Sequence, residues 1–314
     1  MSESHHTLHT TEIDAPARVV HDIIADVTRW PVFFAPNIHV EHLERGERTE
    51  RIHIWATAGG EVKQWTSRRD LDPQTHTVRF RQEVSAAPVA SMDGTWCAKA
   101  LSASRTRLEL HHDFTVVDDA PEHVAWVRAA LDGNSDAELA GIKRVAERHD
   151  EMDALMFAFE DTVHIAGEAG DVFDFLHRAD LWPQRLPHVT RLDLTEDEPG
   201  VQVMAMDTKA ADGSVHTTES VRVVRGADRI VYKQTTVPAL MTAHTGSWTL
   251  VPRDGGVDAT SHHTVVVKPE AVEAVLGAGR TVADARAYIH RALSTNSKAT
   301  LGHAKQYAEE RRAA

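Results

Sequence analysis

Residues 12–31, EIDAPARVVHDIIADVTRWP, return in altered form as residues 164–183, HIAGEAGDVFDFLHRADLWP. The two Trp-Pro pairs begin at positions 30 and 182, which differ by 152 (182 − 30). The same offset relates MDGTW (92–96) to HTGSW (244–248) and VRFRQE (78–83) to IVYKQT (230–235). A repeat of this length is far longer than a solenoid unit. The 314-residue chain is therefore predicted to hold two tandem domains, residues 1–150 and 154–314.

Composition narrows the class of protein. An apolar content of 42% with 26% charged residues is typical of a soluble globular chain. The formal charge of −13 argues against nucleic-acid binding, which requires clustered Lys and Arg. We expect no membrane span, because no apolar run approaches about 18 residues. The polar start and the single Cys97 favour a cytoplasmic location. No dinucleotide, P-loop or HExxH motif occurs, so neither a cofactor nor a metal is expected.

Each copy shows the same order of predicted elements. In the first copy, a strand at 7–13 is followed by Asp14-Ala15-Pro16 and by VVHDIIADV, which has the apolar spacing of a helix that Pro31 should end. Six runs with strand character follow, at 38–45, 50–57, 61–71, 76–84, 90–101 and 105–117, and residues 120–148 form a long amphipathic helix. This α+β order resembles the helix-grip fold of START-type and pollen-allergen-like proteins, a curved antiparallel sheet around a long helix with a cavity between them.

One predicted strand carries an unexpected charge. Residues 63–72 read KQWTSRRDLD, and strand alternation places Trp65, Ser67, Arg69 and Leu71 on the apolar face. A buried guanidinium costs several kcal/mol unless a partner compensates it. Arg69 therefore either faces ligand and water in a cavity, or pairs with a carboxylate that the sequence does not identify.

Three motifs carry a family resemblance. Trp-Pro after the first helix, W-x-S-x-R (Trp65, Ser67, Arg69) and M-x-G-x-W (Met92, Gly94, Trp96) resemble the aromatase/cyclases of bacterial type II aromatic polyketide biosynthesis. The doubled layout is similar to the didomain members of that family.

The resemblance implies a reaction and its partners. Didomain members act on a ketoreduced poly-β-ketone held on an acyl carrier protein, close the first ring by a C7–C12 aldol reaction and dehydrate the C9 alcohol. By resemblance, we expect a cyclase/dehydratase that contacts the carrier protein and, transiently, the ketosynthase and ketoreductase. A non-catalytic carrier or chaperone of an apolar or polyketide ligand is the alternative.

Candidate catalytic residues follow from the chemistry of an enolate. Arginine polarises a carbonyl but is a poor base, so it needs a proton-transfer partner. Histidine titrates near neutral pH, and one inward histidine recurs on the last strand of each copy. The candidate catalytic set is Arg69, Ser67, Arg222, Ser220, His112 and His263.

The candidate substrate-binding residues are aromatic, thioether or amide side chains expected on the cavity wall: Trp30, Phe33, Phe34, Trp65, Gln82, Met92, Trp96, Trp182, Gln234 and Trp248. The tryptophans could equally anchor helix to sheet, and the histidines could be buried core residues.

The two copies also differ from the family pattern and from each other. Phe33 and Phe34 stand where single-domain relatives carry a tyrosine, and the first copy contains no tyrosine, which excludes a phenol relay there. Thr218 stands where the first copy has Trp65. We therefore expect either that the two cavities handle different steps, or that one copy is structural.

Overall fold

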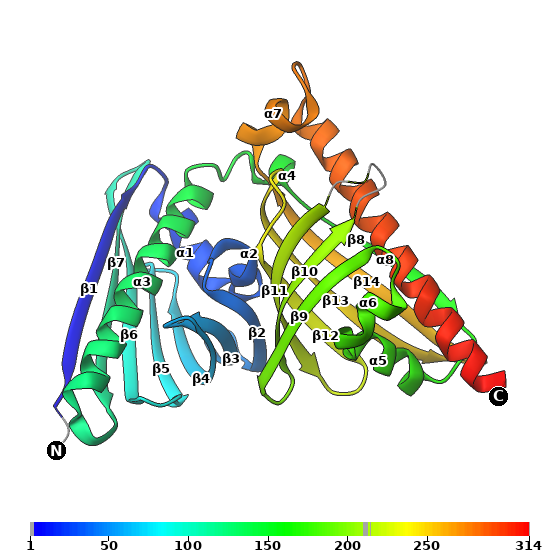
Figure 1. Cartoon of the computed structure of the whole chain (residues 1–314). Helices are drawn as coiled ribbons and strands as arrows, with labels where there is room; N and C mark the ends of the chain where they lie inside the picture. Colours follow the sequence, from blue (N-terminus) through cyan, green and yellow to red (C-terminus); the bar gives the residue numbers. More distant parts are fainter. Residues whose placement is uncertain (1–2, 210–212, 214, 314) are drawn as a thin grey trace. The chain divides into compact units, whose positions relative to one another are not determined.

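The computed structural model describes residues 3–209, 213 and 215–313. The chain separates into two compact units, Met1–Met152 and Asp153–Ala314, which are treated individually below. Within the described residues, each unit contains one seven-stranded antiparallel sheet and a long helix packed across it (Figure 1). This arrangement confirms the predicted helix-grip class.

The N-terminal unit forms a meander that closes on its first strand. Its sheet order is β1-β7-β6-β5-β4-β3-β2, so β1 pairs with the last strand while β2 to β7 follow chain order. Its elements are β1 (His5–Ile13), α1 (Ala17–Ala25), η1 (Val27–Arg29), α2 (Trp30–Phe33), β2 (Asn37–Arg45), β3 (Thr49–Ala58), β4 (Glu61–Asp72), β5 (Thr77–Val84), β6 (Val89–Ser102), β7 (Arg105–Val116), η2 (Val117–Asp119) and α3 (Pro121–Ala146).

The C-terminal unit repeats this topology with the order β8-β14-β13-β12-β11-β10-β9. Its elements are α4 (Met152–Leu155), β8 (Met156–Ile165), α5 (Ala169–His177), η3 (Ala179–Leu181), α6 (Trp182–Arg185), β9 (Val189–Glu198), β10 (Val201–Lys209), β11 (Val215–Arg225), β12 (Arg229–Thr236), β13 (Met241–Arg253), β14 (Gly256–Val267), η4 (Pro269–Ala271), α7 (Val272–Leu276) and α8 (Val282–Ala313). None of the helices in the described part of the chain has the length and apolar character needed to cross a bilayer.

The chain after α1 differs from the expectation that Pro31 ends helical structure. Helix α1 ends at Ala25, and a new short helix, α2, starts at Trp30 with Pro31 in its first turn. The first turn of a helix tolerates proline because its N–H groups have no partner within the helix. Trp182-Pro183 opens α6 in the same way.

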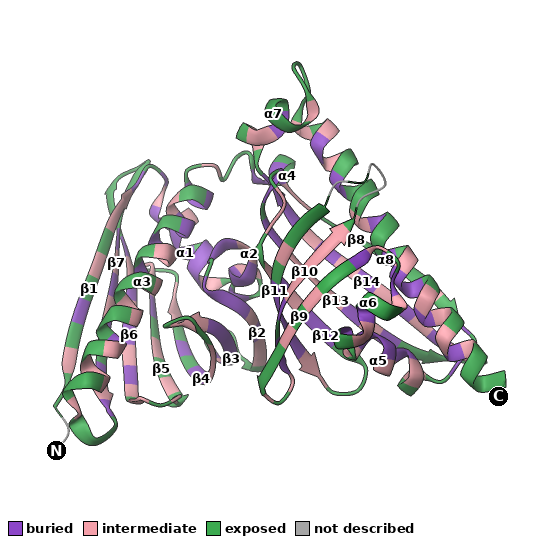
Figure 2. Cartoon of the chain, in the orientation of Figure 1, coloured by how far each residue is buried: buried purple, intermediate pink, exposed green. Residues whose placement is uncertain are grey.

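Each long helix buries one stripe against the concave face of its sheet. Figure 2 shows buried positions on α3 and α8 separated by exposed ones. In α3, Val127, Leu139, Ile142 and Ala146 are buried at spacings compatible with one helical face. This stripe holds the helix on the sheet, while the middle of the helix borders a cavity.

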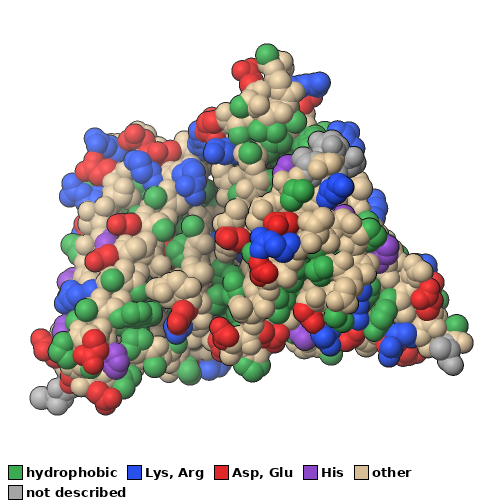
Figure 3. Space-filling view, viewed as in Figure 1, with side chains coloured by type: hydrophobic (Ala, Val, Ile, Leu, Met, Phe, Trp, Pro, Cys, Tyr) green, Lys and Arg blue, Asp and Glu red, His purple; other side chains and the backbone are tan. Residues whose placement is uncertain are grey.

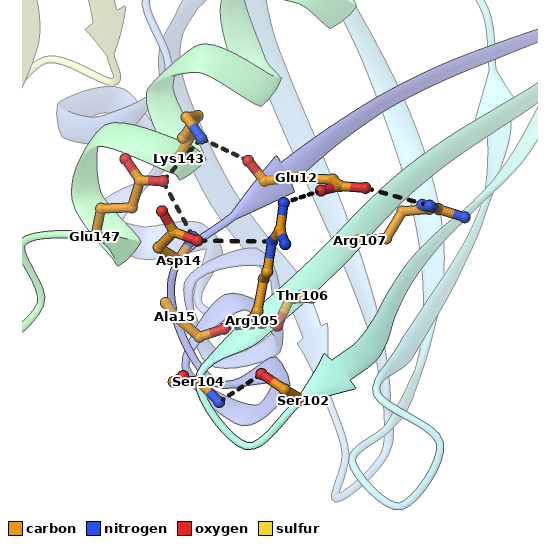
Figure 4. A network of polar contacts seen from close by, with 10 residues as sticks. All are labelled: Glu12, Asp14, Ala15, Ser102, Ser104, Arg105, Thr106, Arg107, Lys143 and Glu147. Carbon is orange, nitrogen blue, oxygen red and sulfur yellow. Dashed lines mark hydrogen bonds and ion pairs between the residues drawn. The ribbon is translucent and has the colours of Figure 1, made fainter.

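A polar network fixes the end of α3 to the start of the sheet (Figure 4). Lys143 donates to the main-chain oxygen of Glu12 at 2.5 Å, and the main-chain nitrogen of Asp14 donates to Glu147 at 3.1 Å. Arg105, in the β6–β7 hairpin, also binds the Glu12 carboxylate. These contacts bring β1, β7 and α3 together at one end of the unit.

Gly141 sets how closely α3 approaches α2. A Cβ atom at Gly141 would lie 2.5 Å from the main-chain oxygen of Phe33, whereas a Cβ atom at Gly133 on the same helix would meet nothing within 4 Å. The first distance is a clash with backbone, which cannot move aside as a side chain can.

We expect Gly141→Ala to lower the free energy of unfolding by about 1–3 kcal/mol through this clash. Gly133→Ala is the matched control and should raise it by up to about 1 kcal/mol, because alanine has the higher helix propensity. Thermal and urea unfolding of both variants measure the difference. Equal effects of the two substitutions would contradict the close packing at Gly141.

Candidate active site

The N-terminal unit holds a cavity between its sheet and α3. The cavity and its mouth contain about 1050 Å³ of empty space. Most of the wall is apolar, and its polar and charged side chains include Lys63, Ser67, Arg69, Gln82, His112, Asn134 and Glu138. Of the residues predicted to bind substrate in this copy, the following lie on the wall: Trp30, Phe34, Trp65, Gln82, Met92 and Trp96.

Phe33 is the exception. It is buried but does not line the cavity, and its ring packs under the Arg29 guanidinium at 4.7 Å. Successive residues of a helical turn point in different directions, so Phe34 and Phe33 cannot both face the cavity from the end of α2. Phe33 therefore lies outside the wall of this cavity, unlike the other residues predicted to bind substrate in this copy.

Arg69 has the carboxylate partner that the sequence left open. Its Nη1 lies 2.6 Å from Oε1 of Glu50, and its Nη2 donates to the main-chain oxygen of Ile24 at 2.6 Å. The side chain is only 1% exposed and forms part of the cavity wall, so it borders the cavity without reaching bulk water. Burial lowers the pKa of Arg69 to about 10, and the nearby Glu50 carboxylate opposes that shift, so the guanidinium stays charged at neutral pH.

The register of one hairpin creates this ion pair. Strands β3 and β4 are joined by Gly59-Gly60, both with positive φ, and Ala58 pairs with Glu61. Counting outward from that turn places Glu50 directly opposite Arg69. A two-residue Gly-Gly turn is a signal visible in the sequence, and it could have identified Glu50.

The same arginine completes the end of the first helix. Ile24 lies in the last turn of α1, where main-chain carbonyls lack partners within the helix. Its oxygen accepts from Arg69 and also from the Trp30 indole at 3.1 Å, and the guanidinium lies 4.7 Å from the centre of the Trp30 ring. The Trp-Pro and W-x-S-x-R motifs therefore meet at one structural point.

His112 does not have the neutral-range pKa that was expected of it. Burial is the main cause that lowers its pKa to about 3, so the imidazole is uncharged at neutral pH. Its Nδ1 atom has no hydrogen-bond partner among the described residues, and its ring lies edge-on to Phe80 with centroids 5.5 Å apart. His112 can accept or donate a hydrogen bond inside the cavity, but it does not store a proton near pH 7.

Glu138 is the titratable group that sequence reasoning missed. It lies on α3 and lines the cavity together with Val127, Leu131 and Asn134, which precede it at helical spacing. Burial raises the pKa of Glu138 to about 7. A polar residue continuing an apolar helical stripe was the available signal. A carboxyl group with this pKa can take or give a proton at neutral pH.

The C-terminal unit has a cavity of its own with about 760 Å³ of empty space. The predicted residues Trp182, Ser220, Arg222, Gln234, Trp248 and His263 all lie on its wall. Arg222 again completes a helix end, donating to the main-chain oxygen of Leu176 at 2.5 Å, and lies 5.2 Å from the centre of the Trp182 ring.

The second arginine lacks the ion pair of the first. Gln202 lies opposite Arg222 in the sheet, where the first copy has Glu50 opposite Arg69. Gln202 donates to Glu196 at 2.8 Å, and neither Nε nor Nη1 of Arg222 has a hydrogen-bond partner within the described residues. Burial lowers the pKa of Arg222 to about 10. The second cavity therefore has a buried cation with unused donors.

Comparison with known proteins agrees with this architecture. The family described as "Polyketide cyclase / dehydrase and lipid transport" matches twice, over residues 4–147 and 156–309. The chain belongs to this family. It is 46% identical over 310 residues to the actinorhodin polyketide synthase bifunctional cyclase/dehydratase of Streptomyces coelicolor, covering 96% of each chain. It is 45% identical to the granaticin polyketide synthase bifunctional cyclase/dehydratase of Streptomyces violaceoruber, covering 97% of this chain and 94% of that one.

Two solved structures match almost the whole length of this cyclase/dehydratase. The di-domain aromatase/cyclase BexL, from the BE-7585A biosynthetic pathway, is 51% identical with a TM-score of 0.86, covering 97% of this chain and 99% of that one. The di-domain aromatase/cyclase StfQ, from the steffimycin pathway, is 36% identical with a TM-score of 0.83, covering 98% and 100%. The resemblance to didomain aromatase/cyclases and the prediction of an enzyme are both confirmed.

The Arg69–Glu50 pair yields a stability prediction. Glu50→Gln should lower the free energy of unfolding by about 3–5 kcal/mol, because it leaves a buried guanidinium without its counter-charge. Glu44→Gln on the neighbouring strand is the control: its pair with Arg51 is solvent-accessible, so the loss should stay below about 1 kcal/mol. Urea unfolding measures both, and a Glu50→Gln variant as stable as Glu44→Gln would contradict the ion pair as a structural requirement.

Proposed function

We propose that this protein is a cytoplasmic aromatase/cyclase that closes the first ring of a C9-ketoreduced poly-β-ketone, carried on an acyl carrier protein, by a C7–C12 aldol reaction and dehydrates it. The observation that supports this most is the position of Glu138, a carboxyl group with a pKa of about 7 on the wall of an aromatic-lined cavity. The named relatives are components of polyketide synthases, which supports the substrate class.

The first cavity has the groups that an aldol closure needs. Ionised Glu138 removes a proton from a methylene group between two carbonyls, giving an enolate. Donors on the facing sheet, the Ser67 hydroxyl and the Gln82 amide, hold the oxygens where negative charge develops. The enolate carbon attacks the second carbonyl, a carbon–carbon bond forms, and Glu138 returns its proton to the new alkoxide.

Arg69 was expected to polarise a substrate carbonyl, but its contacts indicate a positioning role. Its two Nη atoms are engaged by Glu50 and by the α1 carbonyls, so its main effect is to position Trp30 and the wall around Ser67. An Arg69→Ala variant would therefore test the fold as well as the chemistry, and Glu138 is the better target.

The carrier protein must reach the mouth of this cavity. Lys63 is a cation on the cavity wall, with its side chain 28% exposed and paired with Glu61 at 2.6 Å. On the face of the N-terminal unit in view, Lys and Arg side chains are mixed with Asp and Glu (Figure 3). We propose that the acyl carrier protein docks around Lys63. The attraction for this acidic partner would come from a small site at Lys63, and not from a broad basic patch.

A non-catalytic carrier remains the rival function. A carrier of apolar ligands gains nothing from a carboxylate in the cavity, because burying that group costs free energy. The rival predicts that Glu138→Gln binds ligand at least as well as wild type and that neither protein changes the products.

Glu138→Gln is the direct test. Added to a reconstituted synthase with ketoreductase, wild type should yield the aromatised first ring, and the variant should lose about 100-fold or more of that rate. Asp136→Asn, an exposed position on the same helix, is the matched control and should keep wild-type activity. Mass spectrometry of the products decides, with circular dichroism to confirm the fold. Wild-type protein that leaves the products unchanged would overturn the proposed function.

The pH dependence of ring closure provides a second prediction. The base form of Glu138 is populated above its pKa, so the rate should rise with pH up to about 7 and level off above it. The other titratable groups on this wall are Lys63, Arg69 and His112; Arg69 stays cationic and His112 neutral through this range. Single-turnover rates across pH 5.5–8.5 measure the profile, and a flat profile would exclude Glu138 as the base.

A further inference from the structure

The second cavity differs from the first at the positions where proton transfer takes place. In the first unit, Gly94 pairs across the sheet with Phe80 on one side and His112 on the other. In the second, Gly246 pairs with Tyr232 and His263. Both copies therefore carry a histidine at this place, and the phenol of Tyr232 stands where the first copy has the phenyl ring of Phe80.

A second substitution extends this difference. His244 stands at the position in the repeat that Met92 occupies in the first copy, and Thr300 on α8 stands where α3 has Glu138. At these matched positions, the second cavity therefore has a histidine and a tyrosine that the first lacks, and it lacks the carboxyl group that the first has on its long helix.

The added histidine forms a directed hydrogen-bond chain. Nδ1 of His244 lies 2.8 Å from Oε1 of Gln234, a carbonyl oxygen that only accepts, so the proton of neutral His244 is on Nδ1. Nε2 of His244 must then accept, and it lies 3.0 Å from Nδ1 of His263. This places the proton of neutral His263 on Nδ1 and leaves its Nε2 as an acceptor.

Serine completes the chain on the other side. Nε2 of His263 lies 2.7 Å from Oγ of Ser297 on α8 and 3.0 Å from Oγ of Ser261. Burial lowers the pKa of His244 to about 3 and that of His263 to about 4, so both rings are neutral at physiological pH, as this assignment requires. The rings are stacked with centroids 5.2 Å apart.

Tyr232 connects the chain to the cavity. Its hydroxyl oxygen also lies 3.0 Å from Nδ1 of His263, so the single Nδ1 proton is shared between this oxygen and Nε2 of His244. The phenol oxygen therefore accepts, which leaves the phenol proton for a ligand. A Cβ atom at Gly246 would lie 2.4 Å from the Tyr232 hydroxyl oxygen, so only glycine lets the ring lie against the strand. Burial raises the pKa of Tyr232, which keeps the phenol protonated.

We propose that the C-terminal cavity is a dehydration site for a cyclised β-hydroxyketone, in which Tyr232 protonates the departing hydroxyl group and Ser297 and His263 carry the proton removed from the neighbouring carbon. This inference rests on the proposed function for its substrate class. All three side chains line the same cavity.

The step balances without any co-reactant. The α-carbon loses its proton to Oγ of Ser297 as the Ser297 proton moves to Nε2 of His263. The Nδ1 proton of His263 moves to Tyr232, and the Tyr232 proton moves to the departing hydroxyl group. A C–H and a C–O bond break, a C=C bond forms and water leaves. Each side chain ends neutral, and His263 has changed tautomer.

Arg222 supplies the positive charge that this elimination needs. Negative charge develops on the ketone oxygen as the α-proton leaves, and a preorganised cation in a dry site stabilises it strongly. Within the described residues, Gln202 rather than a carboxylate lies opposite Arg222, its Nε and Nη1 atoms have no hydrogen-bond partner, and it lines this cavity. The loss of the acid of the first copy at position 202 is consistent with that role.

The first copy supplies the test substitutions. Tyr232→Phe and His244→Met install the side chains that the first cavity carries at the matched positions, and Ser297→Ala removes the proton acceptor. In the reconstituted synthase with ketoreductase, Tyr232→Phe and Ser297→Ala should lower the rate of aromatic product formation about 100-fold or more and accumulate a cyclised product heavier by one water. His244→Met should lower this rate less than the other two substitutions, because His244 only positions His263. It should alter kcat and leave KM unchanged.

The matched control is Tyr288→Phe, the same chemical change at an exposed tyrosine of this unit, which should leave rate and products unchanged. Nitrogen NMR of labelled histidine gives a readout independent of turnover: His244 and His263 should both carry the proton on Nδ1, and His244→Met should shift the His263 signals. Aromatic product at the wild-type rate from both Tyr232→Phe and Ser297→Ala would overturn this inference alone. Wild-type protein without any effect on the products would overturn the proposed function instead.

Discussion

In both units, a buried arginine on an inner strand donates to a main-chain carbonyl at the end of the helix that follows the unit's first strand. Arg69 binds the oxygen of Ile24, and Arg222 binds the oxygen of Leu176. A tryptophan indole adds a second donor at each helix end, at 3.1 Å in both cases. Unpaired carbonyls at a buried helix end cost free energy, and these side-chain donors satisfy them. The Trp-Pro and x-S-x-R motifs therefore have a structural role, because they supply the donors that these carbonyls need.

Both units meet this constraint in the same way, but the side chains that line their cavities differ. In the first unit, Glu50 neutralises the guanidinium, and the proposed acid–base group lies on α3, at Glu138. In the second, Gln202 lies opposite the arginine, and the proposed proton-transfer groups are Tyr232 and His263 on the sheet and Ser297 on α8. The two copies thus share the contact between the arginine and the helix end, whereas the polar side chains on their cavity walls are different.

The histidines illustrate how burial changes a role inferred from residue type. A free imidazole titrates near neutral pH, which made His112 and His263 natural candidates for acid–base groups. Desolvation in the cavities lowers the pKa of both, so both rings are neutral near pH 7, and the neutral-range titration belongs to a carboxyl group whose pKa burial raises. Burial thus lowers the pKa of the histidines below the neutral range and raises the pKa of Glu138 into it.

The sequence by itself determined the duplication, the antiparallel sheet with its long helix, and the face of each strand on which the motif residues lie. These follow from repeat spacing and from periods of 2.0 and 3.6 residues, which are local properties of the chain. Only the tertiary structure decided which side chains meet. The Gly-Gly turn could have placed Glu50 opposite Arg69, but only folding brings the guanidinium to the end of α1 and the Trp30 ring. Phe34 rather than Phe33 lines the cavity because of the direction of one helical turn, and Glu138 reaches the first cavity because α3 crosses that sheet. Partners and pKa shifts depend on contacts between residues far apart in the chain, which local patterns do not record.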